Sequence, residues 1–314
     1  MAPEKSRVTR QFVSGFSKQS GIPEVWLNQQ FESLELNDKV LTLIQKPYED
    51  KIWGDYEKLF ITSKRVDGGK KFLKDHAVFL QHAERVYGVP KSVITSIIGV
   101  ETSYGQNMGN INTLEALATL SFYYAPRYSF FEDEMKALLK IAYERKWNLQ
   151  EVEGSYAGAI GMPQFMPSNV IRYAVSNDKK SSKLDLFHHP KDAMLSVANY
   201  LSKHGKWQAH EPIVLPIKHL TDKQISLLNK QFENKNILVL DEKLQQLVPP
   251  LDSLPGKTKP GWLIRLRYKD HQDFYFAYNN FKSIMSYNNS TNYAFAVTYL
   301  AAAINDNTNQ LSTN

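Results

Sequence analysis

The chain has 314 residues, of which 42% are hydrophobic and 22% are charged. This length and composition are typical of a folded globular protein with one large domain or a few packed subdomains, and they exclude a disordered chain. The longest apolar candidate for a membrane span, residues 295–304, falls well short of the roughly 20 residues that a spanning helix needs.

Charge and cysteine content narrow the classes of function. Lys and Arg outnumber Asp and Glu by 38 to 32, for a formal charge of +6, which favours an anionic partner such as nucleic acid, acidic lipid or acidic cell-wall polymer. The chain has no cysteine, which excludes disulfides, thiolate nucleophiles, zinc–thiolate sites and iron–sulfur clusters. Because the first residues lack the apolar stretch of a secretory signal, we expect either an intracellular protein or a leader that is absent from this chain.

The first two hundred residues have the pattern of helices separated by glycine and proline. Gly88 and Pro90 end one helix and begin the next, because glycine is favoured just after a helix and proline in a first turn. Asn112 and Glu115 have the spacing of a capping box, in which each side chain bonds the backbone amide of the other. We therefore expect helices over residues 71–87, 90–105, 113–122 and 130–147.

The pattern changes after residue 205 to short runs that are typical of strands. Residues 262–269 alternate large apolar side chains with mostly basic ones, and residues 274–278 follow a polar break, which together predict a hairpin. We expect a small β-containing subdomain at about 211–280, inserted before a last helix at 291–304. Other expected elements are strands at 213–218 and 237–241, a helix at 222–231, and a Pro- and Gly-rich loop at 249–261.

Glu101 has an unusual place on the helix expected over residues 90–105. It lies near the middle of an apolar stripe, four residues after Ile97 and three after Ile98. Burial and the negative end of the helix dipole both disfavour the charged carboxylate, so both raise its pKa. A glutamate with a pKa near the working pH suits general acid catalysis. The alternative is a glutamate at a frayed helix end that reaches solvent or pairs with an arginine.

Several linked motifs are far more specific than any one short pattern: GVETSYG at 99–105, ALATLSF at 116–122 and GSYAGAIGMPQFMPS at 154–168. With YGVP at 87–90, VANY at 197–200 and YNNSTNY at 287–293, they resemble the membrane-bound lytic murein transglycosylase B family over about residues 56–293.

The resemblance implies a mainly α fold, with a lysozyme-like helical catalytic core, an additional helical region and a small inserted antiparallel β subdomain. We accordingly divide the chain into four regions: an N-terminal helical region at 1–55, the catalytic core at 56–210, the β-containing subdomain at 211–280, and a cleft segment and helix at 281–314 that return to the core.

Enzymes of this family cleave the β-1,4 bond between N-acetylmuramic acid and N-acetylglucosamine in peptidoglycan, and they leave 1,6-anhydromuramyl ends. The resemblance implies that Glu101 protonates the glycosidic oxygen and then, as a carboxylate, takes the proton from the C6 hydroxyl that attacks C1. The N-acetyl group of the substrate would stabilise the oxocarbenium-like centre, so one carboxyl group serves where most glycosidases use two.

The same resemblance assigns substrate binding to further residues. Aromatic faces with hydroxyl groups suit pyranose rings, and Arg127 would meet a lactyl or peptide carboxylate. A tyrosine taken alone is more often a core residue, and the glycines around Ser155 are also explained by close helix packing. The expected set is Tyr56, Ser103, Arg127, Ser155, Gln164, Phe165, Tyr200, Tyr287, Asn288 and Tyr293.

No second carboxylate is equally well placed in the sequence. Glu115 is explained as a capping partner, and Glu132 and Glu134 lie in the acidic first turn of the next helix, where the dipole favours them. We also expect no cofactor and no metal. Some relatives hold calcium in an EF-hand-like loop, but residues 176–185 of this chain contain three lysines and no glycine, and His188 and His189 have the pattern of a surface loop.

Three readings of function remain open beside a lytic transglycosylase. The first is a lysozyme-type muramidase that adds water at the same bond, and the second is a catalytically silent peptidoglycan-binding protein. The third, a nucleic-acid binder, lacks any recognised motif, and mixed Lys and Glu patterning is typical of a solvated surface. The expected partners are peptidoglycan glycan strands and, further, cell-wall synthesis proteins. The resemblance implies a periplasmic site in a Gram-negative envelope, with outer-membrane anchoring in a precursor form.

Overall fold

The computed structural model describes residues 3–32, 34–45, 51–177, 184–248 and 261–311. By the contacts within the chain it divides into two compact units. Unit 1 contains Met1–Pro47 and Gly105–Ser196, and unit 2 contains Tyr48–Tyr104 and Val197–Asn314. The division of the sequence into four regions stays a prediction beside this division.

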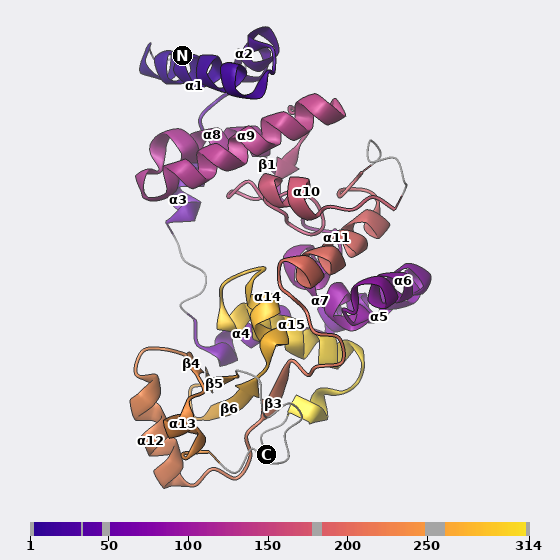
Figure 1. The fold of residues 1–314 in the computed structure, drawn as a ribbon, viewed down its shortest axis with the longest axis vertical. Coiled ribbons are helices and arrows are strands. Elements are labelled where there is room, and N and C mark those ends of the chain that lie inside the picture. The colour runs from indigo at the N-terminus through magenta and orange to yellow at the C-terminus, as the bar shows by residue number, and fades with distance from the viewer. Residues whose placement is uncertain (1–2, 33, 46–50, 178–183, 249–260, 312–314) are drawn as a thin grey trace. The chain divides into compact units, whose positions relative to one another are not determined.

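Unit 1 is helical, with one small ribbon (Figure 1). Helix α8 packs against α9, which also contacts α10, and the two-residue strands β1 and β2 pair antiparallel. The helices are α1 (Pro3–Ser20), α2 (Glu24–Glu32), α3 (Asp38–Ile44), α8 (Thr113–Tyr123), α9 (Tyr128–Arg145), α10 (Pro167–Tyr173) and α11 (Pro190–Lys203), which continues into unit 2. The short elements are η1 (Ala125–Arg127), β1 (Ile111–Asn112) and β2 (Glu153–Gly154).

Unit 2 combines helices with a four-stranded antiparallel sheet of order β3-β6-β5-β4. Its helices are α4 (Trp53–Phe60), α5 (Ser63–Asp75), α6 (Ala77–Tyr87), α7 (Lys91–Thr102), α12 (Asp222–Phe232), α13 (Glu242–Gln245), α14 (Asn279–Met285), α15 (Thr291–Ile304) and the 3-10 turn η4 (Thr308–Leu311). The strands are β3 (Val214–Pro216), β4 (Ile237–Val239), β5 (Trp262–Arg267) and β6 (Gln272–Ala277).

The β-containing part of unit 2 has an apolar core of its own. Strands β5 and β6 form the predicted hairpin, and side chains from both strands pack on α12 and α13. Leu228 and Phe232 of α12 are fully buried against Leu263 and Phe274 of the hairpin. Successive side chains along the strands point to opposite faces, and both faces are largely buried: one packs on α12 and α13, and the other carries the buried Ile264, Leu266 and Tyr275. Most of the Pro- and Gly-rich loop expected at 249–261 lies outside the described residues.

Most of the expected helices are confirmed, and one is wrong in its extent. The side chain of Asn112 caps α8 by accepting the amide of Glu115 at 3.1 Å, and α15 has the bounds expected from the sequence. The helix expected over 71–87 is instead two helices, α5 and α6, which meet at His76 with backbone angles of φ −115° and ψ 19°. The ring of His76 packs 4.5 Å from that of Phe72, one turn earlier in the chain.

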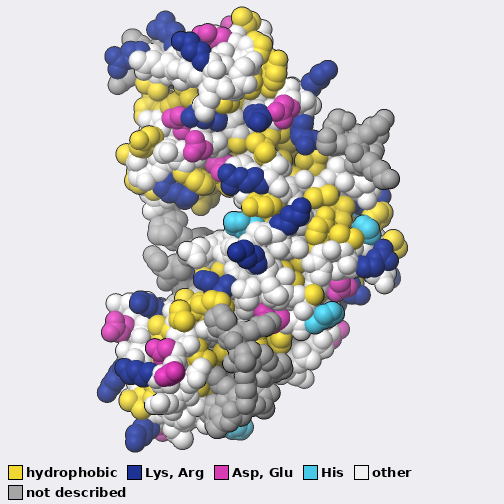
Figure 2. Space-filling model, viewed as in Figure 1, with side chains coloured by type: hydrophobic (Ala, Val, Ile, Leu, Met, Phe, Trp, Pro, Cys, Tyr) yellow, Lys and Arg dark blue, Asp and Glu magenta, His cyan; other side chains and the backbone are white. Residues whose placement is uncertain are grey.

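The surface carries both signs of charge. On the face drawn in Figure 2, Lys and Arg side chains are interspersed with Asp and Glu instead of forming one basic patch. Such mixing is typical of a solvated surface and gives no electrostatic stripe of the kind that binds a nucleic-acid backbone.

Candidate active site

Helix α7, which carries Glu101, is buried along nearly its whole length. Val93, Ile94, Ile97 and Ile98 are between 0% and 2% exposed. The helix packs against α5, α6 and α15 of the same unit (Figure 1). The expected position of Glu101 on an apolar stripe is thus confirmed, because a helix covered on several sides leaves its last turn among apolar neighbours. Glu101 itself keeps intermediate exposure, so a ligand can reach the residue.

The carboxyl group of Glu101 is held by a tyrosine from α15. The hydroxyl of Tyr293 donates to Oε1 of Glu101 at 2.5 Å. Tyr293 lies in the first turn of α15, where its amide donates to the capping side chain of Ser290 at 3.2 Å. The cap fixes the start of the helix, and the packing of α15 on α7 brings the two side chains together.

Two more of the expected tyrosines extend this contact into an aromatic group. The ring of Tyr287 lies 6.4 Å from that of Tyr293, with 10° between their planes, and 4.9 Å from that of Tyr200. The hydroxyl of Tyr200 donates to the carbonyl of Ser286 at 2.6 Å, which ties α11 to the segment before α15. The aromatic group therefore lines one side of Glu101 with apolar faces and a few hydroxyls.

Burial raises the pKa of Glu101 from 4.5 to about 7, and the hydrogen bond from Tyr293 opposes part of that rise. Burial and the nearby charge of Glu101 raise the pKa values of Tyr287 and Tyr293 well above the usual value for tyrosine, so both stay protonated near neutral pH. A carboxyl group with a pKa near 7 populates both its acid and its base form at neutral pH, which suits proton transfer in both directions.

The other candidates of unit 2 lie near this group. Tyr56 is buried, and its ring stacks on that of Phe60 at 4.7 Å. Ser103 ends α7 in the left-handed conformation with φ 49°, and its hydroxyl accepts a hydrogen bond from Arg65 at 3.2 Å. Asn288 follows Tyr287 directly, and its carbonyl accepts the amide of Ser290. The structure thus brings together six of the expected residues and Glu101 in unit 2: Tyr56, Ser103, Tyr200, Tyr287, Asn288 and Tyr293.

The remaining four candidates belong to unit 1. The hydroxyl of Ser155 accepts the amides of Ala157 and Ala159, so it organises its own loop. Gln164 adopts φ 48° and donates through Nε2 to the carbonyls of Met108 and Gly161, both at 3.0 Å.

Phe165 and Arg127 differ sharply in exposure. Phe165 is 1% exposed, so its side chain is part of the core of unit 1. Arg127 is exposed and lies over the ring of Phe130 at 4.1 Å. Of the two, Arg127 is the side chain that is free to meet an anionic group at the surface.

The expectation that Glu132 and Glu134 lie in the first turn of a helix is wrong, because α9 begins at Tyr128 and has no acidic residue in its first turn. Glu134 is 4% exposed, and its two carboxylate oxygens accept the amide and the hydroxyl of Ser168 at 2.8 and 2.7 Å. It therefore caps the start of α10. Glu132, by contrast, forms an ion pair of 2.6 Å with Lys136 one turn along α9.

Arg65 and Tyr104 were not among the expected residues, although both contact the turn that carries Glu101. The guanidinium of Arg65 donates to the carbonyl of Gly99 at 3.0 Å, and the hydroxyl of Tyr104 donates to the carbonyl of Arg65 at 2.7 Å. For Tyr104 the signal in the sequence was the glycine pair Gly68 and Gly69 in a helix, which marks a close approach by another group.

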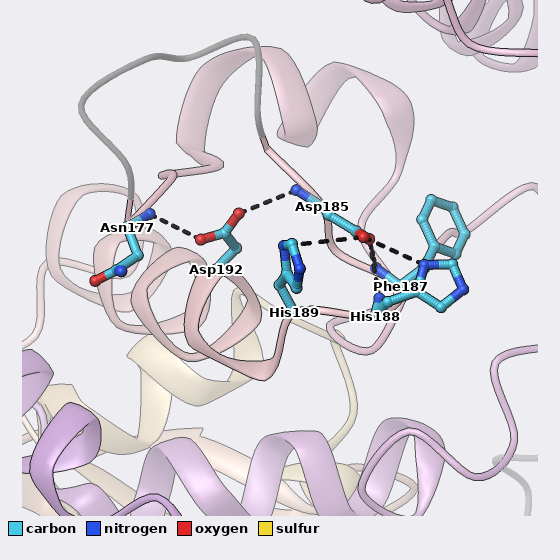
Figure 3. Close-up of polar contacts among 6 residues, drawn as sticks. All are labelled: Asn177, Asp185, Phe187, His188, His189 and Asp192. Carbon is cyan, nitrogen blue, oxygen red and sulfur yellow. Dashed lines mark hydrogen bonds and ion pairs between the residues drawn. The ribbon is translucent and has the colours of Figure 1, made fainter.

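Asp192 binds both described ends of the segment at 176–185 (Figure 3). The buried carboxylate of Asp192 accepts the amide of Asn177 at 2.7 Å and that of Asp185 at 3.0 Å. Asp185 in turn accepts the amides of Phe187 and His188. In the part of the chain that the structure describes, no three His, Asp or Glu side chains gather closely enough to hold a metal ion.

Comparison with known proteins agrees with this geometry. A family model described as the transglycosylase SLT domain matches residues 5–302. Membrane-bound lytic murein transglycosylase B of Escherichia coli K12 is 36% identical over 254 residues, which cover 80% of this chain and 67% of that protein.

Solved structures give the same assignment. Soluble lytic transglycosylase SltB1 from Pseudomonas aeruginosa matches with a TM-score of 0.84 and 32% identity over 95% of this chain and 98% of that one. SltB3 from the same organism, in complex with NAG-NAM-pentapeptide, matches with a TM-score of 0.78 and 28% identity over 95% of this chain and 79% of that one.

The match to solved lytic transglycosylases places the chain in the class of glycan-cleaving enzymes with a lysozyme-like fold, and the half-buried acid bonded by Tyr293 agrees with that class. The chain belongs to the transglycosylase SLT domain family, and it is a lytic transglycosylase. In the described ranges, none of the helices has the length and hydrophobicity that crossing a lipid bilayer requires.

Proposed function

We propose that Glu101 is the single catalytic acid and base with which this enzyme cleaves the β-1,4 bond between N-acetylmuramic acid and N-acetylglucosamine in peptidoglycan. The observation that supports the proposal is the pKa of about 7 of this carboxyl group, which burial raises and a hydrogen bond from Tyr293 limits. A group poised in this way can give a proton and take one back in the same catalytic cycle.

In the first step, protonated Glu101 transfers its proton to the glycosidic oxygen while the bond from that oxygen to C1 of the muramyl residue breaks. The N-acetyl group of the substrate stabilises the positive charge that develops at C1. The leaving sugar departs with a new hydroxyl group, and Glu101 becomes a carboxylate whose charge the hydroxyl of Tyr293 stabilises.

In the second step, the C6 hydroxyl of the same muramyl residue attacks C1, and its proton passes to the carboxylate of Glu101. A 1,6-anhydro ring forms, the enzyme returns to its starting protonation state, and no water is consumed. The burial that raises the pKa of Glu101 supports this course, because it limits the access of bulk water to the carboxyl group.

The other predicted residues would bind the glycan strand. Tyr56, Tyr200, Tyr287 and Tyr293 offer rings and hydroxyls suited to pyranoses, and the remaining candidates are Ser103, Asn288, Ser155, Gln164, Phe165 and Arg127. The relative SltB3 is described in complex with a NAG-NAM-pentapeptide, which supports a substrate of the same chemistry here. The exposed guanidinium of Arg127 would pair with a carboxylate of the lactyl group or the peptide stem.

Digestion of purified peptidoglycan in water enriched in oxygen-18, followed by mass spectrometry of the products, tests the reaction. We expect anhydromuramyl ends without the heavy isotope. Reducing muramic ends that carry oxygen-18 would instead identify a muramidase. The variant Glu101→Gln should lose turnover by about three orders of magnitude or more, since proton transfer by one group contributes about 10² to 10⁴.

Glu132→Gln, which changes a carboxylate of the surface ion pair with Lys136, is the matched control and should retain the activity of the parent. If Glu101→Gln binds and clears peptidoglycan as fast as the parent, the assignment of Glu101 fails. Binding without turnover by the parent protein would support the silent-binder alternative.

A protein that acts on this substrate works where peptidoglycan is found. We infer a periplasmic location, with attachment to the outer membrane in a precursor form, from the membrane-bound relative of Escherichia coli. Cell-wall synthesis proteins are the further partners that such an enzyme would have. Fractionation of cells that produce the complete protein tests the location.

A further inference from the structure

The guanidinium of Arg65 contacts the chain on both sides of Glu101. Its Nε donates to the carbonyl of Gly99 at 3.0 Å, and its Nη2 donates to the hydroxyl of Ser103 at 3.2 Å. Gly99 comes two residues before Glu101, and Ser103 comes two residues after it. One side chain from α5 therefore holds the whole last turn of α7.

The other end of the same guanidinium is fixed to a second segment. Nη1 of Arg65 donates to the carbonyls of Leu59 and Phe60, at 2.6 and 3.2 Å. These carbonyls lie at the end of α4, and the guanidinium also lies 5.1 Å from the centre of the Phe60 ring. Only the planar fork of arginine presents several N–H groups in the directions that these acceptors require, so lysine could not reproduce the set.

The last turn of a helix needs such bonds. Its final carbonyls have no partners farther along the helix, and Ser103 stands in a left-handed conformation that costs a residue other than glycine about 1 kcal/mol. The carbonyl of Gly99 already accepts the amide of Ser103, and Arg65 supplies a second donor. Arg65 therefore stabilises an end of helix that would otherwise fray.

Tyr104 adds a second link between α5 and the end of α7. Its hydroxyl donates to the backbone carbonyl of Arg65 at 2.7 Å, and its own φ is 64°. The ring lies so close to α5 and α7 that a Cβ added to Gly68 would come within 2.9 Å of it, and one added to Gly99 within 2.7 Å. The ring therefore lies directly against the backbone at these glycines, so the turn is packed as well as hydrogen-bonded.

The geometry points to Arg65 as a positioning residue that holds the last turn of α7, so that the carboxyl group of Glu101 stays against Tyr293. The inference rests on the proposed catalytic role of Glu101. It follows from the bonds on either side of that residue, because a carboxyl group carried on a frayed turn would lose both its orientation and its contact with the tyrosine. A misplacement of about 1 Å can cost about 10² in rate.

A merely structural role for Arg65, fastening α5 to α7, makes a different prediction. Such a role would lower the fraction of folded protein without changing the folded molecules. A positioning role changes the folded enzyme, because loosening of the turn admits water to Glu101, which lowers its pKa, and weakens the bond from Tyr293, which opposes that fall. Burial is the larger of the two effects, so the net shift of the pKa is downward. The alkaline limb of the pH profile of kcat/KM, which reports the acid in the free enzyme, separates the two.

The groups around Glu101 allow this limb to be assigned. Tyr293 of α15 and Tyr287 stay protonated near neutral pH because their pKa values are raised. Tyr56 of α4 and Tyr200 of α11 lie beside these two tyrosines, and from α5 Arg65 carries its positive charge throughout the range. His204 packs 4.9 Å from the ring of Tyr200, so His204→Gln is a control for titration of that imidazole.

The experiment compares Arg65→Lys with the parent on soluble glycan strands of peptidoglycan, with thermal unfolding measured in parallel. We expect kcat to fall about tenfold or more, KM to change by less than about twofold, and the alkaline limb to move to lower pH by about half a unit. Arg85→Lys, which changes an exposed arginine whose side chain bonds His82, should match the parent.

The inference is overturned if kcat and the alkaline limb of the pH profile are both unchanged. It is also overturned if activity falls only in proportion to the unfolded fraction while the limb stays in place, or if KM alone changes. If Arg65→Lys does not fold, Ser103→Ala decides the question, since it removes only the acceptor of Nη2 and should move the limb in the same direction. An unmoved limb in that variant counts against the inference. If Glu101→Gln is fully active, the proposed function fails; if it is inactive while Arg65→Lys behaves as the parent, only the positioning role fails.

Discussion

The hydroxyl of Tyr293 lies 2.5 Å from Oε1 of Glu101, although 192 positions separate the two residues in the chain. Glu101 is in the last turn of α7 and Tyr293 is in the first turn of α15, and these helices pack against each other. Burial favours the neutral acid, whereas the hydrogen bond favours the carboxylate. The balance of these two effects places the pKa in the range where the group can act as acid and as base.

Replacing Glu101 by glutamine should stabilise the protein at alkaline pH. The pKa of about 7 in the folded state lies above the ordinary 4.5, so the stability that protonation contributes is complete below about pH 4.5 and is lost as the pH rises through 7. Glutamine stays neutral and can still accept the hydroxyl of Tyr293. At about pH 8 the free energy of unfolding should be higher than that of the parent by up to about 3 kcal/mol, since one pKa unit corresponds to about 1.4 kcal/mol.

Urea unfolding near pH 8 and near pH 4.5 measures this difference. The gain should nearly vanish at the lower pH, where the parent is itself protonated. An equal difference between variant and parent at both pH values would show that the pKa of Glu101 is not raised by folding.

Replacing Tyr293 by phenylalanine should move the alkaline limb of kcat/KM to higher pH. The lost hydrogen bond is the one that lowers the pKa of Glu101, so the acid form would persist farther, by about half to one pH unit. Tyr299→Phe is the matched control, because this tyrosine of the same helix bonds Tyr275 at 3.0 Å. A limb that stays in place in Tyr293→Phe, or moves equally in both variants, would contradict the role of the bond.

Glu134 should prove structural and not a second catalytic carboxylate. In Glu134→Ala the amide of Ser168 loses its acceptor and a cavity forms at the buried Glu134, so we expect a loss of about 2 to 4 kcal/mol in unfolding free energy. Glu132→Ala removes a partly exposed ion pair with Lys136 and should cost less than about 1 kcal/mol. Glu134→Gln keeps an acceptor for the amide and should retain turnover on peptidoglycan; its inactivation would indicate a second acid.

The carboxylate of Asp192 should contribute to the stability of the folded protein. Each oxygen of Asp192 accepts one backbone amide, and asparagine retains one acceptor only, so Asp192→Asn should cost about 1 to 3 kcal/mol. In Asp185→Asn a single oxygen can keep both amides that the aspartate now accepts on Oδ1, and the loss should be smaller. Thermal unfolding of the three proteins measures this order, and equal losses would contradict it.

Calcium should leave the unfolding temperature of the parent unchanged, because both oxygens of Asp192 are occupied by backbone amides. The segment at 176–185 also carries three lysines and no glycine, which is unlike a calcium loop. Thermal unfolding with calcium and with a chelator checks this expectation. A higher unfolding temperature in calcium would show a binding site that these contacts do not account for.

Local patterns in the chain were sufficient for many of the elements. Gly88 and Pro90 separate α6 from α7, the side chain of Asn112 caps α8, and the apolar run before Glu101 makes a helix that must be buried. These features depend on residues within one or two turns of each other, so helical periodicity and capping chemistry reveal them. The placement of Glu101 among apolar residues of its helix is also a local feature of this kind.

Contacts between distant segments could not be predicted in this way. The burial of Glu134 against Ser168 and the reach of Arg65 to Gly99 each depend on which helices pack side by side. No local pattern marks Arg65, because its acceptors are backbone carbonyls and one hydroxyl, which carry no signature of their own.

Sequence alone was thus enough to identify Glu101 as an acid on a helix that folding buries, since the apolar residues around it are its neighbours in the chain. The tertiary structure was needed to find what holds that acid and tunes it: Tyr293 from α15 on one side and Arg65 from α5 on the other. The reason is physical. A pKa depends on burial and on hydrogen bonds in three dimensions, and those arise only when helices that are far apart in the chain pack together.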